Sequence, residues 1–129
     1  WNENRREYLR RFEKYYKSRS IDLVNNQKIC GLLGLATRAG KIVAGTDACL
    51  QEIEKHNVKL LILAVDSADR TKKVFNEKCK EFNITVYEGL TIDEISNSIG
   101  KPNKAVVGIK DKGFAQAINK IISGGEMIG

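Results

Sequence analysis

The sequence is poor in the residues that cross-link extracellular proteins and that build metal centres. Its three cysteines are odd in number and include no Cys-x-x-Cys pair, so neither a disulfide framework nor a structural zinc site is expected. The single histidine, His56, leaves little material for a His-rich metal site or a Ser/His/Asp centre. We therefore expect a protein of the reducing cytoplasm that holds no metal and no other cofactor.

Long hydrophobic runs are also missing. The longest, Leu60 to Val65, is far shorter than the roughly 20 residues that a helix needs to cross a bilayer. The first residues are polar and charged, unlike a secretory signal. With 129 residues, 42% of them hydrophobic, the chain has material for one ordinary core but not for two. No membrane partner is expected.

Positive charge is in excess and is unevenly distributed. Lys and Arg number 22 against 16 Asp and Glu, a net charge of +6 that favours anionic partners such as nucleic acid. Residues 1–24 contain seven basic and four acidic residues, so half of the net charge falls in the first fifth of the chain. Residues 25–46 add three basic residues and no acid, and residues 70–80 add five basic residues and one acid. Solvated helix faces explain the second group better than the first, which borders a glycine-containing turn.

Residues 1–24 differ from the rest of the chain and are expected to form a separate basic, aromatic extension. Tyr8, Phe12 and Tyr15 recur at helical spacing, which predicts a helix over residues 3–17. Arginines and lysines surround this aromatic stripe. Such a helix is suited to RNA, with rings available for stacking, or to docking on the domain, a second copy or another protein partner.

Residues 25–129 alternate between helix and strand patterns and are expected to form one domain. Apolar residues at helical spacing from Gln27 to Ala39 predict its first helix. Four strands are predicted, each followed by an amphipathic helix; the strands are Ile42–Ala44, Leu60–Val65, Ile84–Tyr87 and Ala105–Ile109. The second is apolar throughout, as a central strand buried on both faces should be. This order predicts the α/β class, with a three-layer α/β/α sandwich of about four strands and an extra N-terminal helix.

One segment, Ala39 to Asp47, has the features of an anion site. Thr46 or Asp47 is expected to cap the helix that follows Gly45, and a helix start presents free backbone N–H groups to phosphate. Gly45 permits close approach of another backbone. Arg38 and Lys41 lie just upstream in sequence and are expected to neutralise phosphates.

Catalytic patterns are scarce. No Gly-x-x-x-x-Gly-Lys-Ser/Thr phosphate loop occurs. Asp66 and Asp69 follow the central strand, where a carboxylate pair suits a metal, but turn formation and helix capping explain them more simply. The three cysteines fall on apolar helix faces and are expected in the core.

The run from Leu33 to Gly45, Leu-Gly-Leu-Ala-Thr-Arg-Ala-Gly-Lys-Ile-Val-Ala-Gly, resembles the opening of the ribosomal protein L-seven-Ae / L-thirty-e superfamily, and most of all its small bacterial YlxQ-like members. Residues 59–66 match the family's central strand, and Ile99-Gly100-Lys101 with the strand from Ala105 match its later part. The resemblance covers about residues 25–122 and implies an α/β/α sandwich that binds structured RNA, typically a kink-turn.

The resemblance also implies where RNA is bound. In the family, the turn before the second helix and its first two turns meet tandem sheared G·A pairs, and a loop after the fourth helix packs on an extruded base. The family's Gly-x-Asn-Glu-x-x-Lys signature falls on residues 45–51; only Gly45 is kept, while Asp47, Ala48 and Gln51 replace its Asn, Glu and Lys. We place the loop for the extruded base near Leu90.

The predicted RNA-binding residues come from this resemblance and from the anion-site argument; they are Arg38, Lys41, Gly45, Thr46, Asp47, Gln51, Lys55, Leu90, Thr91 and Ile92. Lys72 and Lys73 are further candidates for phosphate contacts. No catalytic and no metal-binding residue is assigned.

Three functions follow from the sequence. The first is a non-catalytic, ribosome-associated protein that binds structured, kink-turn-like RNA. The second is a protein-interaction module that kept the fold and lost kink-turn specificity, since the signature is degraded. The third is an enzyme with a site at Asp66 and Asp69, for which no nucleophile–base pair or complete metal set is available.

Overall fold

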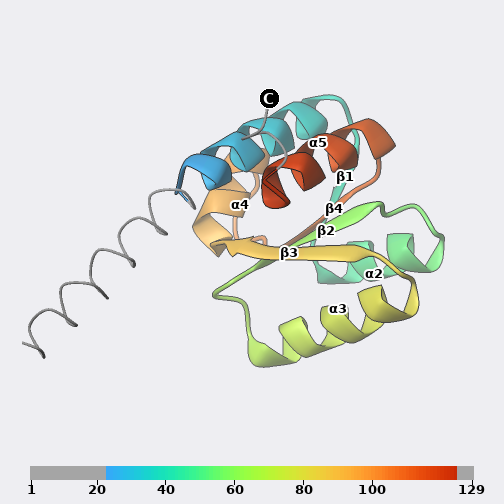
Figure 1. Ribbon diagram of the computed structural model, residues 1–129. Helices are drawn as coiled ribbons and strands as arrows, with labels where there is room; N and C mark the ends of the chain where they lie inside the picture. The colour runs from blue at the N-terminus through green and yellow to red at the C-terminus, as the bar shows by residue number, and fades with distance from the viewer. Residues whose placement is uncertain (1–22, 125–129) are drawn as a thin grey trace, which may run out of the picture.

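The computed structural model describes residues 23–124 and has the predicted alternation of helices and strands (Figure 1). A first helix covers residues 23–38. Four strand–helix pairs follow: β1 (Ile42–Ala44) and α2 (Thr46–Glu54), β2 (Leu60–Ala64) and α3 (Asp69–Glu81), β3 (Thr85–Leu90) and α4 (Ile92–Ile99), β4 (Val106–Ile109) and α5 (Lys112–Ile122). The helix predicted over residues 3–17 lies outside the described residues.

The four strands form one mixed sheet in the order β1-β4-β2-β3. β2 and β3 are parallel, while β4 lies between β1 and β2 and is antiparallel to both. β1, β2 and β3 therefore run in one direction. We call the edge where these three strands end and β4 begins the carboxyl edge; it comprises residues 45–47, 65–69, 91–92 and 100–105. The opposite edge, residues 38–41, 55–59, 82–84 and 110–111, is the amino edge.

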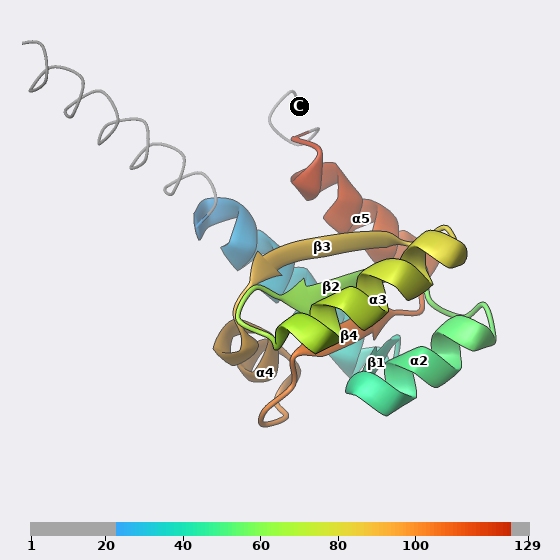
Figure 2. The same ribbon diagram turned by 90° about the horizontal axis from the view of Figure 1, so that it is seen from below.

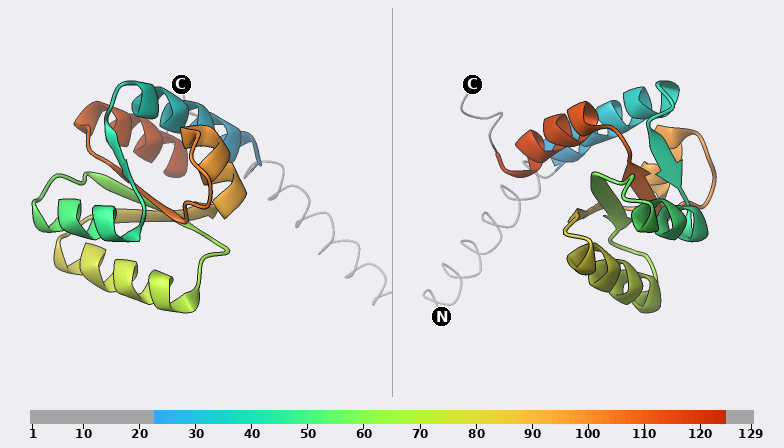
Figure 3. Two further views of the ribbon diagram at one scale, coloured as in Figure 1. Left: turned by 180° about the vertical axis from the view of Figure 1, so that it is seen from behind. Right: turned by 90° about the vertical axis from the view of Figure 1, so that its right-hand side faces the viewer.

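Helices cover both faces of the sheet (Figures 1 and 3). The first helix, α4 and α5 lie on one face, and α2 and α3 lie on the other, so the predicted α/β/α sandwich is confirmed. Each face has its own buried cluster, with Ile29, Ile62 and Ile118 in one and Leu61, Phe75 and Cys79 in the other. All of β2 is buried, as predicted for a strand packed on both sides. No helix within residues 23–124 is long and apolar enough to span a membrane.

The third strand differs from its predicted bounds. It was expected over Ile84–Tyr87, but β3 continues to Leu90, whose side chain is 0% exposed. The polar residue Glu88 and the glycine after it hid this continuation, because they break the alternation that marks a half-buried strand. α4 then begins at once, since Thr91 and Glu94 form a capping box.

Candidate nucleic-acid interface

The carboxyl edge brings together the start of α2, the turn before α3 and the loop between α4 and β4. Figure 2 shows these three segments on the same side of the sheet. They meet because the ends of three co-directional strands and the beginning of β4 share one edge. Any site assembled here uses backbone groups at helix starts together with side chains of the loops.

Gly45 sets the conformation in which α2 begins. It is the N-cap residue, with φ 98° and ψ 157°, a region of backbone conformation that is essentially restricted to glycine. Its N–H donates to the carbonyl oxygen of Val106 at 3.0 Å, which fastens the turn to β4. No side chain caps α2. The prediction that Thr46 or Asp47 is the N-cap is wrong, because the glycine turn places both residues inside the helix.

An uncapped helix start is a site of partial positive charge. Thr46 and Asp47 are exposed, and no side chain caps α2, so the first N–H groups of the helix are left for an anion. The carboxylate of Asp47 lies in this first turn and complements the helix dipole. An incoming phosphate meets free amides here, and the same phosphate is repelled by Asp47.

The α4–β4 loop adds a cation that the sequence analysis missed. A Cβ placed on Gly45 would lie 3.6 Å from Nζ of Lys104. The backbone N–H of Lys104 donates to Oγ of Ser96 at 2.9 Å, and that of Lys101 donates to the Ser96 carbonyl at 3.1 Å, so α4 holds both ends of this turn. A cation beside a helix N-terminus is unfavourable in the absence of an anion, and Asp47 of the first turn already supplies one carboxylate here. Lys104 and the amides of α2 together therefore favour a phosphate between them.

Leu90, Thr91 and Ile92 occupy a different part of this edge. Leu90 is buried, Thr91 caps α4, and the N–H of Ile92 donates to Oδ1 of Asp66 at 2.8 Å. β4 and β2 separate them from α2, a distance of roughly 14 Å at about 4.8 Å per strand. The structure thus does not bring these residues to the start of α2. The loop that follows the fourth helix is instead residues 100–105, which begins at Gly100, the left-handed C-cap of α4.

Arg38 and Lys41 are near Gly45 in sequence but not in space. Both are exposed, and both precede β1, whereas Gly45 follows it. The four extended steps along the chain from Lys41 to Gly45 span about 13 Å, so the two cations lie at the amino edge. Lys55 is the C-cap of α2 and lies at the amino edge as well. Gln51 stays close to the site: it is exposed and stands one turn after Asp47 on the same face of α2.

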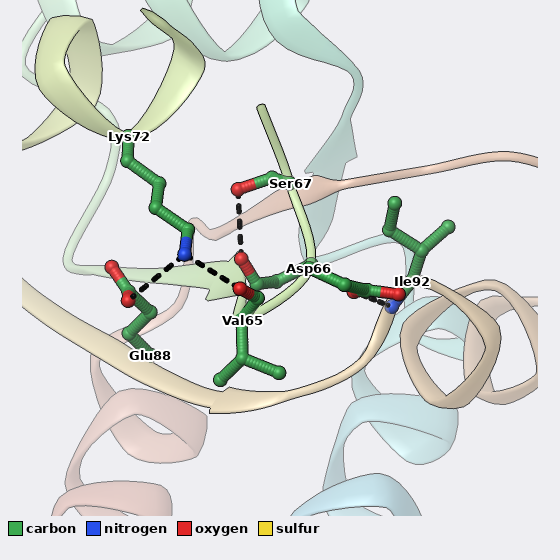
Figure 4. A network of polar contacts seen from close by, with 7 residues as sticks. Val65, Asp66, Ser67, Lys72, Glu88 and Ile92 are labelled. Carbon is green, nitrogen blue, oxygen red and sulfur yellow. Dashed lines mark hydrogen bonds and ion pairs between the residues drawn. The ribbon is translucent and has the colours of Figure 1, made fainter. Parts of the chain in front are cut away.

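The acids after β2 are engaged in turn structure. Asp66 accepts a hydrogen bond from the backbone N–H of Ile92 at the start of α4. It therefore caps α4 and not α3, the helix that follows it in sequence. Ser67 donates to the Ala64 carbonyl at 2.7 Å, and Lys72 donates to the Val65 carbonyl at 2.6 Å and pairs with Glu88 at 3.6 Å (Figure 4). Lys72 therefore braces the turn before α3. Lys73 is exposed on the same helix.

Two kinds of reactive group, metal-ligand clusters and thiols, can be assessed in the described residues. Within residues 23–124, no three His, Cys, Asp or Glu side chains come together as metal ligands. Burial raises the pKa of Cys49 to about 12 and that of Cys79 to about 11, so both thiols stay protonated near neutral pH. Both lie in the core as predicted, while Cys30 is half-buried.

Comparison with known proteins places this chain in a family. Residues 27–119 match the ribosomal protein L7Ae/L30e/S12e/Gadd45 family. The chain is 37% identical over 100 residues to an RNA-binding protein YlxQ of Enterococcus faecium, a match that covers 78% of this chain and 96% of that protein. It is 38% identical over 92 residues to the RNA-binding protein YlxQ of Bacillus subtilis (strain 168), covering 71% of this chain and 89% of the relative.

Solved structures agree with this assignment. A protein of unknown function from Bacillus halodurans C superposes with a TM-score of 0.72 at 32% identity, covering 74% of this chain and 97% of that one. The Giardia lamblia 15.5kD RNA binding protein superposes with a TM-score of 0.61 at 17% identity, covering 85% and 89%, which shows a shared fold. The chain belongs to the ribosomal protein L7Ae/L30e/S12e/Gadd45 family.

Proposed function

We propose that this protein binds structured RNA at the carboxyl edge and catalyses no reaction. The observation that carries this proposal is the uncapped start of α2 with Lys104 at 3.6 Å from the Cβ position of Gly45. Backbone amides and an ammonium group converge there on a place suited to one phosphate. The RNA-binding names of the YlxQ relatives support RNA as the ligand.

The proposed target is a kink-turn-like element of ribosomal or another structured RNA in the cytoplasm. A kinked helix offers splayed bases and an irregular backbone, which proteins recognise more readily than the closed grooves of regular A-form RNA. Asp47 and Gln51, exposed on one face of α2, are the proposed base contacts, and Thr46 adds a hydroxyl. The loop over residues 100–105 takes the place that we had assigned to Leu90–Ile92, beside an extruded base.

The direct test is titration of the full chain with a stem that contains tandem G·A pairs beside a bulge. The control RNA replaces the G·A pairs with Watson–Crick pairs. We expect the kinked stem to bind at least tenfold more tightly, and Lys104→Ala to weaken its binding about tenfold, or about 1.4 kcal/mol. Lys120→Ala, an exposed lysine of α5, is the matched control and should change nothing.

Equal binding of both RNAs would remove the kink-turn specificity while leaving RNA binding in place. Failure of either RNA to bind, together with recovery of a protein partner that survives nuclease treatment, would favour the protein-interaction module instead. Crosslinking in cells followed by sequencing of the bound RNA identifies the target. Cosedimentation with ribosomes tests the proposed ribosome association.

A further inference from the structure

The amino edge carries a row of lysines across three neighbouring strands. Lys41 and Lys110 face each other across β1 and β4: the Lys110 N–H donates to the Lys41 carbonyl at 2.8 Å. On the other side of β4, the N–H of Lys59 donates to the carbonyl of Ile109 at 2.7 Å. Neighbouring strands lie about 4.8 Å apart, so the three lysines succeed one another at that spacing along the edge.

These lysines belong to the side of the sheet that α2 and α3 cover. Nζ of Lys110 lies 3.8 Å from Glu52 of α2, and residues opposite each other in an antiparallel pair point to the same face, so Lys41 points that way too. Glu52 also accepts from Asn57 at 2.8 Å. In the described part of the chain, Lys41 and Lys59 make no ion pair. Among the described residues, the acid that pairs with this row is Glu52, and it also accepts the hydrogen bond from Asn57.

A cavity of about 280 Å³ opens beside Lys59, between the ends of α2 and α3. Its lining contains apolar side chains and two aromatic rings. The lining residues are Ile53, His56, Val58, Lys59, Phe82, Asn83 and Ile84. The ring centroids of His56 and Phe82 are 5.2 Å apart, at an interplanar angle of 48°. Nζ of Lys78, which pairs with Glu54, lies 5.4 Å from the Phe82 centroid, so His56 is the ring that is left for a ligand. No carboxylate is among the lining residues. The volume is just below the range of ligand pockets, about 300–1,000 Å³, and fits a single flat heterocycle.

The backbone at His56 has a conformation that glycine adopts more readily than other residues. His56 has φ 62°, the left-handed conformation that normally ends a helix on glycine. Glycine would adopt it without strain, whereas a side chain at this position is uncommon. The chain therefore places an imidazole at the mouth of the cavity where helix termination requires none.

We propose that the amino edge is a second RNA-binding surface, at which an unpaired base stacks on His56 beside Phe82 and the flanking phosphates lie on Lys59, Lys110 and Lys41. Rings for stacking beside a line of cations are the recurring means by which proteins hold single-stranded nucleic acid. The inference takes its ligand class from the proposed function but uses different residues, on the opposite edge of the sheet from Gly45 and Lys104.

The test measures binding of oligo(A) and of the kinked stem to the full chain and its variants. His56→Gly removes the ring and keeps the backbone conformation, so loss of folding does not confuse the result. We expect His56→Gly to weaken oligo(A) binding roughly tenfold, since base–aromatic stacking has about that effect for each base. Lys59→Glu should weaken it at least as much, and the charge-matched Lys120→Glu should leave it near the wild-type value.

The outcomes separate this inference from the proposed function. If the kinked stem binds in a Lys104-dependent way while His56→Gly and Lys59→Glu bind oligo(A) like Lys120→Glu, the amino-edge proposal is wrong and the carboxyl-edge proposal stands. Loss of oligo(A) binding in His56→Gly with unchanged binding of the kinked stem supports two surfaces. If oligo(A) does not bind and polyglutamate does, with dependence on Lys59, the edge recognises an acidic protein and the RNA assignment is overturned.

Discussion

The two edges of the sheet place lysines near opposite ends of α2. At the amino edge, Lys55 and Lys110 lie around the C-terminal end of α2, where a helix carries partial negative charge that stabilises cations without any ligand. At the carboxyl edge, Lys104 lies beside the N-terminal end of the same helix, where the partial charge is positive. Protein stability therefore explains part of the first group and does not explain Lys104.

The edges also differ in what surrounds the cations. Asp47, Asp66 and Asp69 are exposed carboxylates of the carboxyl edge, and two of them lie in first helical turns. The cavity of the amino edge has none in its lining. Net charge alone would select the amino edge as the RNA surface, whereas geometry selects the carboxyl edge. The comparison teaches that a lysine beside a helix N-terminus indicates a phosphate-binding site more specifically than a row of lysines does. A row of lysines indicates only a surface that attracts anions.

The largest effect on stability and on RNA binding is expected at Gly45, where the backbone has a conformation that is essentially restricted to glycine. Gly45→Val forces a β-branched residue into φ 98° and ψ 157°, which should lower the free energy of unfolding by about 1–3 kcal/mol. It should also abolish binding of the kinked stem, because α2 can no longer begin at the same place. Chemical denaturation measures the first effect. Gly31→Ala, at an exposed helical position with open space around it, is the control and should stabilise the fold slightly.

Salt dependence distinguishes the edges by residue. Each phosphate contact contributes about 0.7 to the slope of log affinity against log salt for a single strand, and about 0.9 for a duplex. Lys104→Ala should lower the slope by about that amount for the kinked stem, and Lys59→Ala should do so for oligo(A). If Lys104→Ala leaves the slope for the kinked stem unchanged, Lys104 makes no phosphate contact. The same holds for Lys59→Ala and the slope for oligo(A).

Removing the charge of Asp47, the acid in the first turn of α2, should strengthen binding at the carboxyl edge. Asp47→Asn ends the repulsion of phosphate and adds an amide donor, so we expect about fivefold tighter binding of the kinked stem, or about 1 kcal/mol. Asp69→Asn, also in a first helical turn but at the start of α3, is the matched control. Equal gains in both variants would indicate general charge reduction and not contact at α2.

His56→Gly should have opposite effects on stability and on binding. Replacing a left-handed residue by glycine relieves strain, so we expect the folded state to become up to about 1 kcal/mol more stable while oligo(A) binding weakens. Thermal denaturation measures the stability. If the variant is less stable, contact between the imidazole and Phe82 outweighs the backbone strain, and the argument that the ring is held there for a ligand loses its support.

The smallest effect concerns Glu52 at the amino edge. The hydrogen bond from Asn57 lowers the pKa of Glu52, and Lys110 and Lys55 lower it further. A carboxyl with a depressed pKa in the folded state contributes stability above its unfolded pKa, near 4.5, and loses it as the pH falls through the folded value. Glu52→Gln should therefore flatten the acid limb of stability slightly and raise oligo(A) affinity. A steeper acid limb would contradict this account.

The periodicity of apolar residues predicted the helices and strands well, because each element buries apolar residues at the spacing of its own backbone. The apolar run at Leu60 and the i, i+3, i+4 spacing of the helices follow directly from packing on the sheet. The order of the strands does not appear in any local pattern. It is the insertion of β4 between β1 and β2 that moves Lys104 next to Gly45, and no spacing in the sequence reports that neighbourhood.

The site was predicted in part for the same reason. Gly45, Thr46, Asp47 and Gln51 lie together because they are local to one helix start. Arg38 and Lys41 were assigned to that start by sequence proximity, but a strand lies between and carries them to the other edge. The loop for the extruded base is predicted near Leu90 from the family resemblance, but Leu90 ends β3 and Thr91 caps α4, so these residues precede the fourth helix and do not follow it.

The antiparallel strand β4 also sets the distance between the two edges of the sheet. β4 begins just after Lys104 and ends just before Lys110, and six extended residues measure about 20 Å. A polynucleotide that touches both ends at once has to reach across that gap, which corresponds to about six stacked bases at 3.4 Å each. If both proposed surfaces bind RNA, oligonucleotides shorter than this are expected to contact one end of β4 or the other, but not both.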